Sequence, residues 1–156
     1  MLTYENVKNT VKRIVLEKPE FVYPASEDCT TCDEHREWDE GYWTGKNEPP
    51  LCNAHKQDSC LYFYSNDLGQ PIPSRPACVV GHWFHAEGLQ PEDFGVRRWE
   101  EIEGRGVNAV LPGLMQEIET EAIDFLYNLQ SLQDTGSTWL DSYVTATARV
   151  EGRTNV

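Results

Sequence analysis

Two pairs of potential metal ligands constrain this chain more than any other feature of its sequence. Cys29 and Cys32 are separated by two residues, and so are Cys52 and His55, with nineteen residues between the pairs. This spacing is typical of a chain that wraps a tetrahedral Zn²⁺ ion, because each pair lies on a tight turn and the loop brings the two turns together. Four protein ligands leave no open position for substrate water. The spacing therefore predicts a structural zinc site.

Two other interpretations of the first pair stay open. Cys29 and Cys32 could be reduced thiols on a loop, or could form a reversible disulfide. A redox pair normally opens a helix in an electropositive setting that favours the thiolate. Here Asp28, Asp33 and Glu34 surround the pair, and their negative charge disfavours the thiolate. Zinc ligation is therefore the preferred interpretation.

The fourth ligand is also open. Cys60 is an alternative to His55 in this position, and His35 lies close enough along the chain to compete. Cys60 is also an apolar-flanked residue, which is typical of a buried small side chain.

Residues 25–59 differ in composition from the rest of the chain. The carboxylates before Pro49 are Glu27, Asp28, Asp33, Glu34, Glu37, Asp39, Glu40 and Glu48. A loop of this length inside a compact domain needs something to hold it, and metal ligation supplies this where a short polar segment lacks a core. We therefore expect a single domain over residues 1–156, in which 25–59 is an acidic Cys/His loop insertion clipped by Zn²⁺.

Charge limits the classes of partner. The chain has 156 residues, with 26 Asp and Glu against 13 Lys and Arg, and a formal net charge of −13. Neutralising phosphates requires a basic patch, so we expect no direct binding to nucleic acid or to a membrane. Residues 1–20 lack the pattern of a signal peptide, and the five cysteines are an odd number. These features predict a cytoplasmic protein with reduced or metal-bound cysteines.

The remaining pattern predicts an α+β fold that is mainly α, with about four helices and a short β-hairpin. Apolar residues recur at helical spacing over 3–18, where Thr3 is a suitable N-cap and Pro19 ends the pattern. A strand over 60–64 is expected to pair with one that begins at Ile72. The further helices are expected over 77–87 with Gly88 after it, over 106–111, around 118–132 up to Gly136, and from Ser137 or Thr138 onward, with 151–156 as a frayed tail.

Polar residues near the predicted helix ends have structural interpretations. Gln130, Gln133 and Asp134 are expected to bond to neighbouring backbone and tie the last two helices together, with Trp139 buried between them. Three alternating carboxylates favour the positive end of the long helix, and they are Glu117, Glu119 and Glu121.

Cys78 and His82 raise the question of catalysis. They are four residues apart on a predicted helix, which brings their side chains together. A helical Cys–His pair is more often packing than a nucleophile with its base, and we expect Cys78 to be a buried small hydrophobe. His82 and His85 are interpreted as surface histidines, because a second metal site would need further ligands.

Three segments carry a resemblance to known proteins. They are the N-terminal helix that ends in Pro19-Glu-Phe-Val-Tyr23, the Cys60-Leu-Tyr-Phe strand followed by Pro76-Ala-Cys78-Val-Val-Gly81-His, and the stretch from Leu129 to Trp139. Together they resemble small uncharacterised proteins of actinobacterial phages and their hosts. The resemblance implies a phage or prophage setting, where small acidic proteins commonly bind host machinery, and it implies no catalytic residues. Members of the group run more directly from the first helix to the Cys–aromatic strand, which implies that 25–59 is specific to this branch.

These observations favour a non-enzymatic accessory protein that binds a host or partner protein, itself basic, through an acidic face. Aromatic residues beside charges are typical of interface anchors and rims. The residues expected to form this face are Asp33, Glu34, Glu37, Trp38, Asp39, Glu40, Tyr42 and Trp43. Two alternatives remain: a nucleic-acid mimic that inhibits a DNA- or RNA-binding protein, and a Cys-dependent enzyme.

Overall fold

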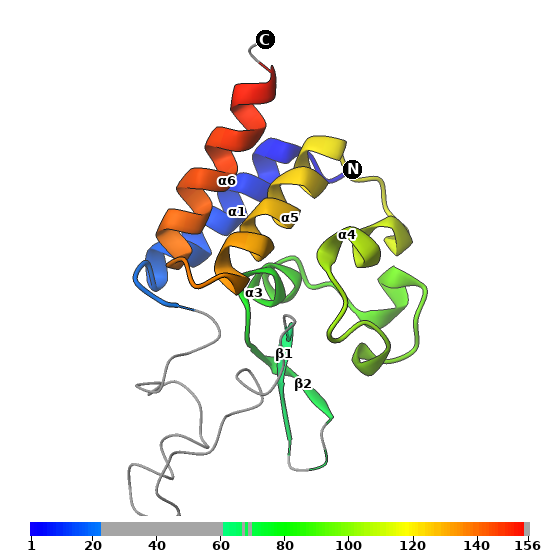
Figure 1. The fold of residues 1–156 in the computed structure, drawn as a ribbon. Coiled ribbons are helices and arrows are strands. Elements are labelled where there is room, and N and C mark those ends of the chain that lie inside the picture. Colours follow the sequence, from blue (N-terminus) through cyan, green and yellow to red (C-terminus); the bar gives the residue numbers. More distant parts are fainter. Residues whose placement is uncertain (23–60, 67, 69, 155–156) are drawn as a thin grey trace, which may run out of the picture.

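The computed structural model describes residues 1–22, 61–66, 68 and 70–154, and it is mainly helical with one two-stranded antiparallel hairpin (Figure 1). The elements are α1 (Tyr4–Glu17), β1 (Phe63–Ser65), β2 (Pro71–Pro76), α3 (Val79–Ala86), η1 (Pro91–Phe94), η2 (Trp99–Glu101), α4 (Val107–Val110), η3 (Leu111–Gly113), α5 (Thr120–Asp134) and α6 (Trp139–Thr154). The described ranges hold more helical segments than expected, because the short turns η1, η2 and η3 add to the helices; α4 lies within the helix predicted over 106–111. The predicted zinc-clipped module, 25–59, lies outside the described residues.

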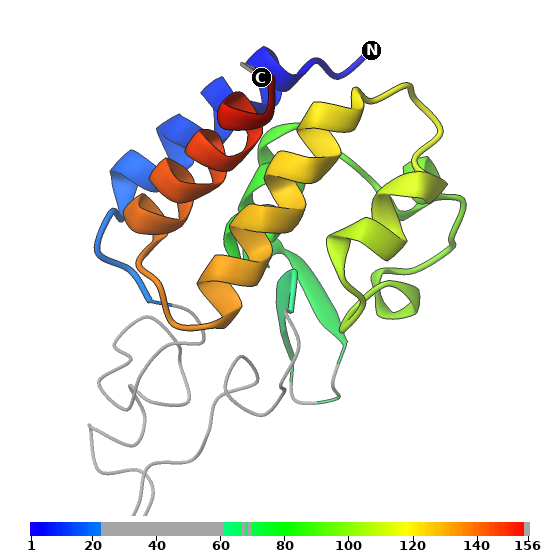
Figure 2. The same ribbon diagram turned by 45° about the horizontal axis from the view of Figure 1, so that its top comes forward.

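Helices α1, α5 and α6 run side by side in one layer, as Figures 1 and 2 both show. Helix α1 begins where the sequence predicts, because the Thr3 side chain accepts a hydrogen bond from the backbone N–H of Asn6 at 3.3 Å. Its inward face carries Val7, Val11 and Val15, which are all buried. The spacing of these valines places one continuous apolar stripe against the other two helices.

Helix α3 lies beneath this layer and is the most buried element of the fold. A Cβ atom on Gly81 would lie 1.8 Å from the carbonyl oxygen of Tyr62, so only glycine allows this close approach of helix and strand. On its far side, Phe84 contacts Phe94 and Trp99, with ring centroids 5.0 and 6.0 Å away. Aromatic packing therefore joins α3 to the short turns that follow it.

The hairpin confirms the strand pairing predicted from the sequence. β1 and β2 are antiparallel, with Phe63 opposite Pro76 and Ser65 opposite Pro71 and an irregularity between them. The connecting turn is ordered by Asn66, whose side-chain oxygen accepts from the backbone N–H groups of residues 68 and 70 at 3.0 and 2.9 Å.

The last helix begins as expected but ends later. Thr138 accepts a hydrogen bond from the backbone N–H of Asp141 at 3.1 Å, which identifies it as the N-cap. The frayed tail expected over 151–156 is wrong in its first residues, because α6 continues to Thr154. Val150 is buried in the core, and Glu151 forms a 2.9 Å ion pair with Lys8 of α1. These tertiary contacts extend the helix.

The polar residues of α5 connect different elements from those predicted. Glu119 does not cap its own helix; it accepts from the backbone N–H of Tyr4 at 2.6 Å and so caps α1. The side-chain oxygen of Gln133 accepts from the N–H of Val79 at 2.8 Å. That of Gln130 accepts from the N–H of Val107 at 2.7 Å. These two bonds join α5 to the beginnings of α3 and α4, because those helix starts present unpaired N–H groups toward it.

Candidate ligand pocket

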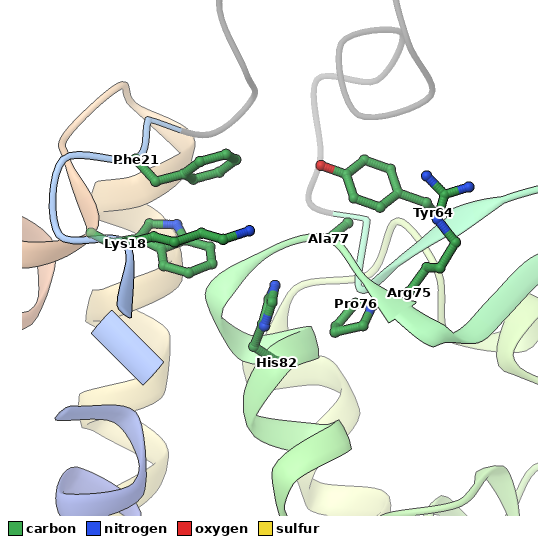
Figure 3. A pocket seen from close by; sticks show the side chains of 8 residues that line it. Lys18, Phe21, Tyr64, Arg75, Pro76, Ala77 and His82 are labelled. Carbon is green, nitrogen blue, oxygen red and sulfur yellow. The ribbon is translucent and has the colours of Figure 1, made fainter. Parts of the chain in front are cut away.

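A cavity of about 170 Å³ lies between the end of α1, the hairpin and the start of α6. Figure 3 shows the side chains that surround it. They are Lys18, Phe21, Tyr64, Arg75, Pro76, Ala77, His82 and Trp139. Residues far apart in the sequence therefore form one site.

One wall of the cavity is aromatic and rigidly held. The ring centroids of Phe21 and Trp139 are 4.8 Å apart at an interplanar angle of 58°. Phe21 is fixed because its carbonyl accepts from the N–H of Trp139 at 2.9 Å, and the carbonyl of Pro19 accepts from the N–H of Leu140 at 3.0 Å. Val22 adds an antiparallel bridge to Thr138. The segment after α1 is thus docked on the start of α6. Trp139 is buried as the sequence predicts, and its ring contacts Phe21 and His82.

Two cations border this cavity in a protein of net charge −13. The ammonium of Lys18 lies 5.8 Å from the ring centroid of Phe21, and the guanidinium of Arg75 lies 5.5 Å from that of Tyr64. Both arrangements are within the range of cation–π attraction. Two cationic side chains therefore lie beside aromatic rings at the border of the pocket.

His82 forms the floor of the pocket. Its ring packs edge-on against Trp139, with centroids 5.1 Å apart. Burial lowers the pKa of His82 to about 4, with further lowering by Lys18 and His85, while a hydrogen bond to the backbone of Pro76 acts in the opposite direction. The imidazole is therefore neutral at neutral pH, with one N–H donor and one acceptor nitrogen. The interpretation of His82 as a surface residue is wrong, because the end of α1 and the start of α6 cover it; His85 is exposed as expected.

Cys78 has a structural position. Its side chain is fully buried, and the sulfur accepts a hydrogen bond from the N–H of Gly81 at 3.3 Å, so it occupies the N-cap of α3. This confirms the prediction of a buried small residue.

Glu103 is a buried carboxylate that sequence reasoning missed. Its two carboxylate oxygens accept from the backbone N–H groups of Tyr62 and Phe63 at 3.0 and 3.1 Å. Burial raises the pKa of Glu103 to about 8, the two amides oppose this rise, and Glu100 adds to it. Glu103 therefore fixes the backbone just before β1. No local pattern could have found it, because its partners lie about forty residues away.

The site residues predicted from the sequence lie outside the described part of the chain. This is true of the metal ligands Cys29, Cys32, Cys52 and His55, with Cys60 as the alternative, and of the acidic, aromatic face over 33–43. Within the described ranges, no group of three or more His, Cys, Asp or Glu side chains could hold a metal ion. The zinc site therefore stays a prediction.

In the described residues no helix combines the length and apolar character needed to cross a membrane. Comparison of the chain with known proteins gives no match to a family model, a curated protein or a solved structure.

Proposed function

We propose that this chain is a non-enzymatic accessory protein that binds a host or partner protein through the acidic, aromatic segment 25–59. The resemblance to phage proteins favours a phage or prophage setting, with the host cell cytoplasm as the place of action. The contact residues would be Asp33, Glu34, Glu37, Trp38, Asp39, Glu40, Tyr42 and Trp43. A structural Zn²⁺ ion held by Cys29, Cys32, Cys52 and either His55 or Cys60 would keep the segment in shape.

The observation that carries the proposal is the way the described body holds both flanks of the segment. Before it, Val22 is bridged to Thr138 and Phe21 packs on Trp139. After it, Leu61 is buried and its carbonyl accepts from the N–H of Cys78 at 3.2 Å. Phe21 before the segment and Tyr64 after it line the same pocket. Because both flanks are anchored on the body, the body is suited to presenting the segment between them from one of its faces.

The composition of the segment supports a protein partner of opposite charge. Its carboxylates would steer a basic surface toward it and raise the association rate. Trp38 and Trp43 are the residue type that most often supplies binding energy at the centre of an interface. The acidic residues would then form the rim, where their contribution to affinity depends on ionic strength.

The test is capture of partners from an actinobacterial lysate by the full chain and by two variants of equal net charge. One variant neutralises five carboxylates of the segment, as D33N, E34Q, E37Q, D39N and E40Q. The control neutralises five exposed carboxylates of the body, as E17Q, E92Q, E100Q, E121Q and D141N. We expect the first variant to lose the partner and the second to keep it. Equal capture by all three proteins would refute the proposed face.

The zinc part of the proposal has its own test. Elemental analysis of the purified protein should find stoichiometric zinc, which falls in Cys29→Ser and Cys52→Ser variants. A zinc-free protein that captures its partner normally would refute the metal site and leave the acidic face supported.

A further inference from the structure

We propose that residues 18–22, which we call the strap, detach from α6 when His82 gains a proton. The strap runs from the end of α1 to the start of α6, and Figure 3 shows its Lys18 and Phe21 side chains on one side of the His82 ring. All of these residues belong to the described body, so the strap acts independently of the proposed partner face. Its release is an acid-sensitive conformational change built into the fold.

The strap is attached to α6 by contacts near its surface. The backbone N–H of Trp139 donates to the carbonyl of Phe21 at 2.9 Å, and that of Leu140 donates to the carbonyl of Pro19 at 3.0 Å. The Phe21 ring packs on the Trp139 ring, with centroids 4.8 Å apart. Phe21 and Val22 are only half-buried, unlike the core of the helices. Segments with little buried area open at a lower free energy than the core, so the strap can open while the rest of the fold stays intact.

His82 links the strap to pH. Its ring lies edge-on to Trp139 with centroids 5.1 Å apart, and one ring N–H donates to the backbone carbonyl of Pro76. The other ring nitrogen must gain a proton to form the imidazolium. Burial disfavours this charge and is the main reason why the pKa of His82 is lowered to about 4 from an ordinary 6.5. Opening the strap hydrates the ring, so the open form binds the proton more readily.

The cations near His82 act in the same direction as burial. Lys18 and His85 both disfavour a proton on His82. Lys18 belongs to the strap itself, and its side chain lines the same cavity as the imidazole. Like charges disfavour each other when both are ionised. Movement of the strap therefore relieves the repulsion and the burial together.

The other elements around α3 supply further titratable groups. Of the described residues that line the cavity with His82, none is acidic. On the hairpin side, Tyr64 and Arg75 line the cavity and have interactions of their own. On α5, the carboxylate of Asp134 accepts from the side chain of Gln133 at 3.1 Å. Within this part of the chain, the closed cavity therefore gives an imidazolium no carboxylate partner.

The direction and size of the effect follow from the two pKa values. The pKa of His82 is lower in the closed form than in the open form, so the closed strap is most stable above pH 6.5 and loses stability as the pH falls toward 4. With the ordinary pKa restored in the open form, the open population rises about twentyfold between about pH 7 and about pH 5.

The experiment is amide hydrogen exchange of the full chain, followed by NMR at about pH 7 and about pH 5 and corrected for the intrinsic exchange rate at each pH. The amides of Trp139 and Leu140 are the reporters, because both donate to the strap. The amide of Asp141 is the matched control, because it donates to Thr138 in the same turn of α6. We expect the protection of the two reporters to fall about ten- to twentyfold at the lower pH, and that of the control to change by less than about twofold.

Matched variants identify the titrating group. His82→Gln removes the ionisable ring from the cavity, and His82→Phe repeats this with a ring in its place. His85→Gln removes an exposed imidazole from the same helix. We expect both His82 variants to keep the protection of the reporter amides at about pH 5, and H85Q to lose it as the parent does. Unchanged protection in the parent, an equal loss at the control amide, or the parent's loss in a folded His82 variant would each overturn the proposal.

Discussion

Replacing Gly81 with alanine tests the closest contact in the core. A Cβ atom at this position would lie 1.8 Å from the carbonyl oxygen of Tyr62 and 2.7 Å from its carbonyl carbon. That carbonyl cannot move freely, because it accepts from the N–H of Ala77 at 2.8 Å. The backbone N–H of Tyr62 donates to Glu103, and the Tyr62 hydroxyl donates to the carbonyl of Arg105 at 2.6 Å. The clash must therefore be relieved by separating α3 from the strand.

The cost follows from these contacts. Overpacking that shifts backbone costs about 1–3 kcal/mol. Loss of the Ala77–Tyr62 hydrogen bond inside the core adds about 1–3 kcal/mol. We therefore expect Gly81→Ala to lower the free energy of unfolding by about 4 kcal/mol. For a chain of this size each kcal/mol shifts Tm by about 2–4 °C, so Tm should fall by about 10 °C.

The same substitution at Gly152 is the matched control. Nothing lies within 4 Å of a Cβ atom there, and the residue is in the last turns of α6. Alanine has the higher helix propensity, so Gly152→Ala should raise the free energy of unfolding by about 0.5 kcal/mol. Both variants are compared with the parent by urea denaturation followed by circular dichroism. A G81A variant within about 1 kcal/mol of the parent would show that the close packing of α3 on the strand is wrong.

Three further predictions concern single polar groups. Burial raises the pKa of Glu103 to about 8 from an ordinary 4.5, so the folded state keeps a proton that the unfolded state loses. The parent therefore loses stability as the pH rises from 4.5 to 8. In urea denaturation, the free energy of unfolding of Glu103→Gln relative to the parent should increase over this range and stay constant above pH 8. Thr138→Ala removes the cap bonded to Asp141 and should lower the free energy of unfolding by about 1 kcal/mol; an unchanged free energy of unfolding would refute that role. Gln133→Met leaves the buried N–H of Val79 without its acceptor and should cost about 2 kcal/mol by the same assay, whereas a neutral result would mean that the bond is absent.

The elements that the sequence predicts well are those with local signals. Helix α1 has a capping threonine before it and Pro19 after it, and its structure agrees with the predicted limits to within a residue. Gly88 and Gly136 were expected after helix ends, and both have positive φ angles of 68° and 96°. Such signals act over one or two turns, so a single sequence is enough to detect them.

The contacts that the sequence does not predict are those between distant segments. A carboxylate just before a helix normally interacts with that helix, yet Glu119 caps α1 because Leu2 and Ile118 are bridged side by side. The extension of α6 depends on Glu151 reaching Lys8. The pocket could not be predicted either, since Lys18 and Arg75 line one hollow only in the folded chain. The predicted metal ligands and acidic face lie in a segment outside the described residues. Both therefore stay predictions from the sequence.

The position of α1 has a consequence for how the protein is made. It packs against α3, α5 and α6, and the last two leave the ribosome about a hundred residues after it. At about 5–20 residues per second, the nascent helix therefore waits several seconds before α5 and α6 can cover it. During this interval it is a natural substrate for chaperones, and the native layer can assemble only once the carboxyl-terminal third of the chain has been synthesised.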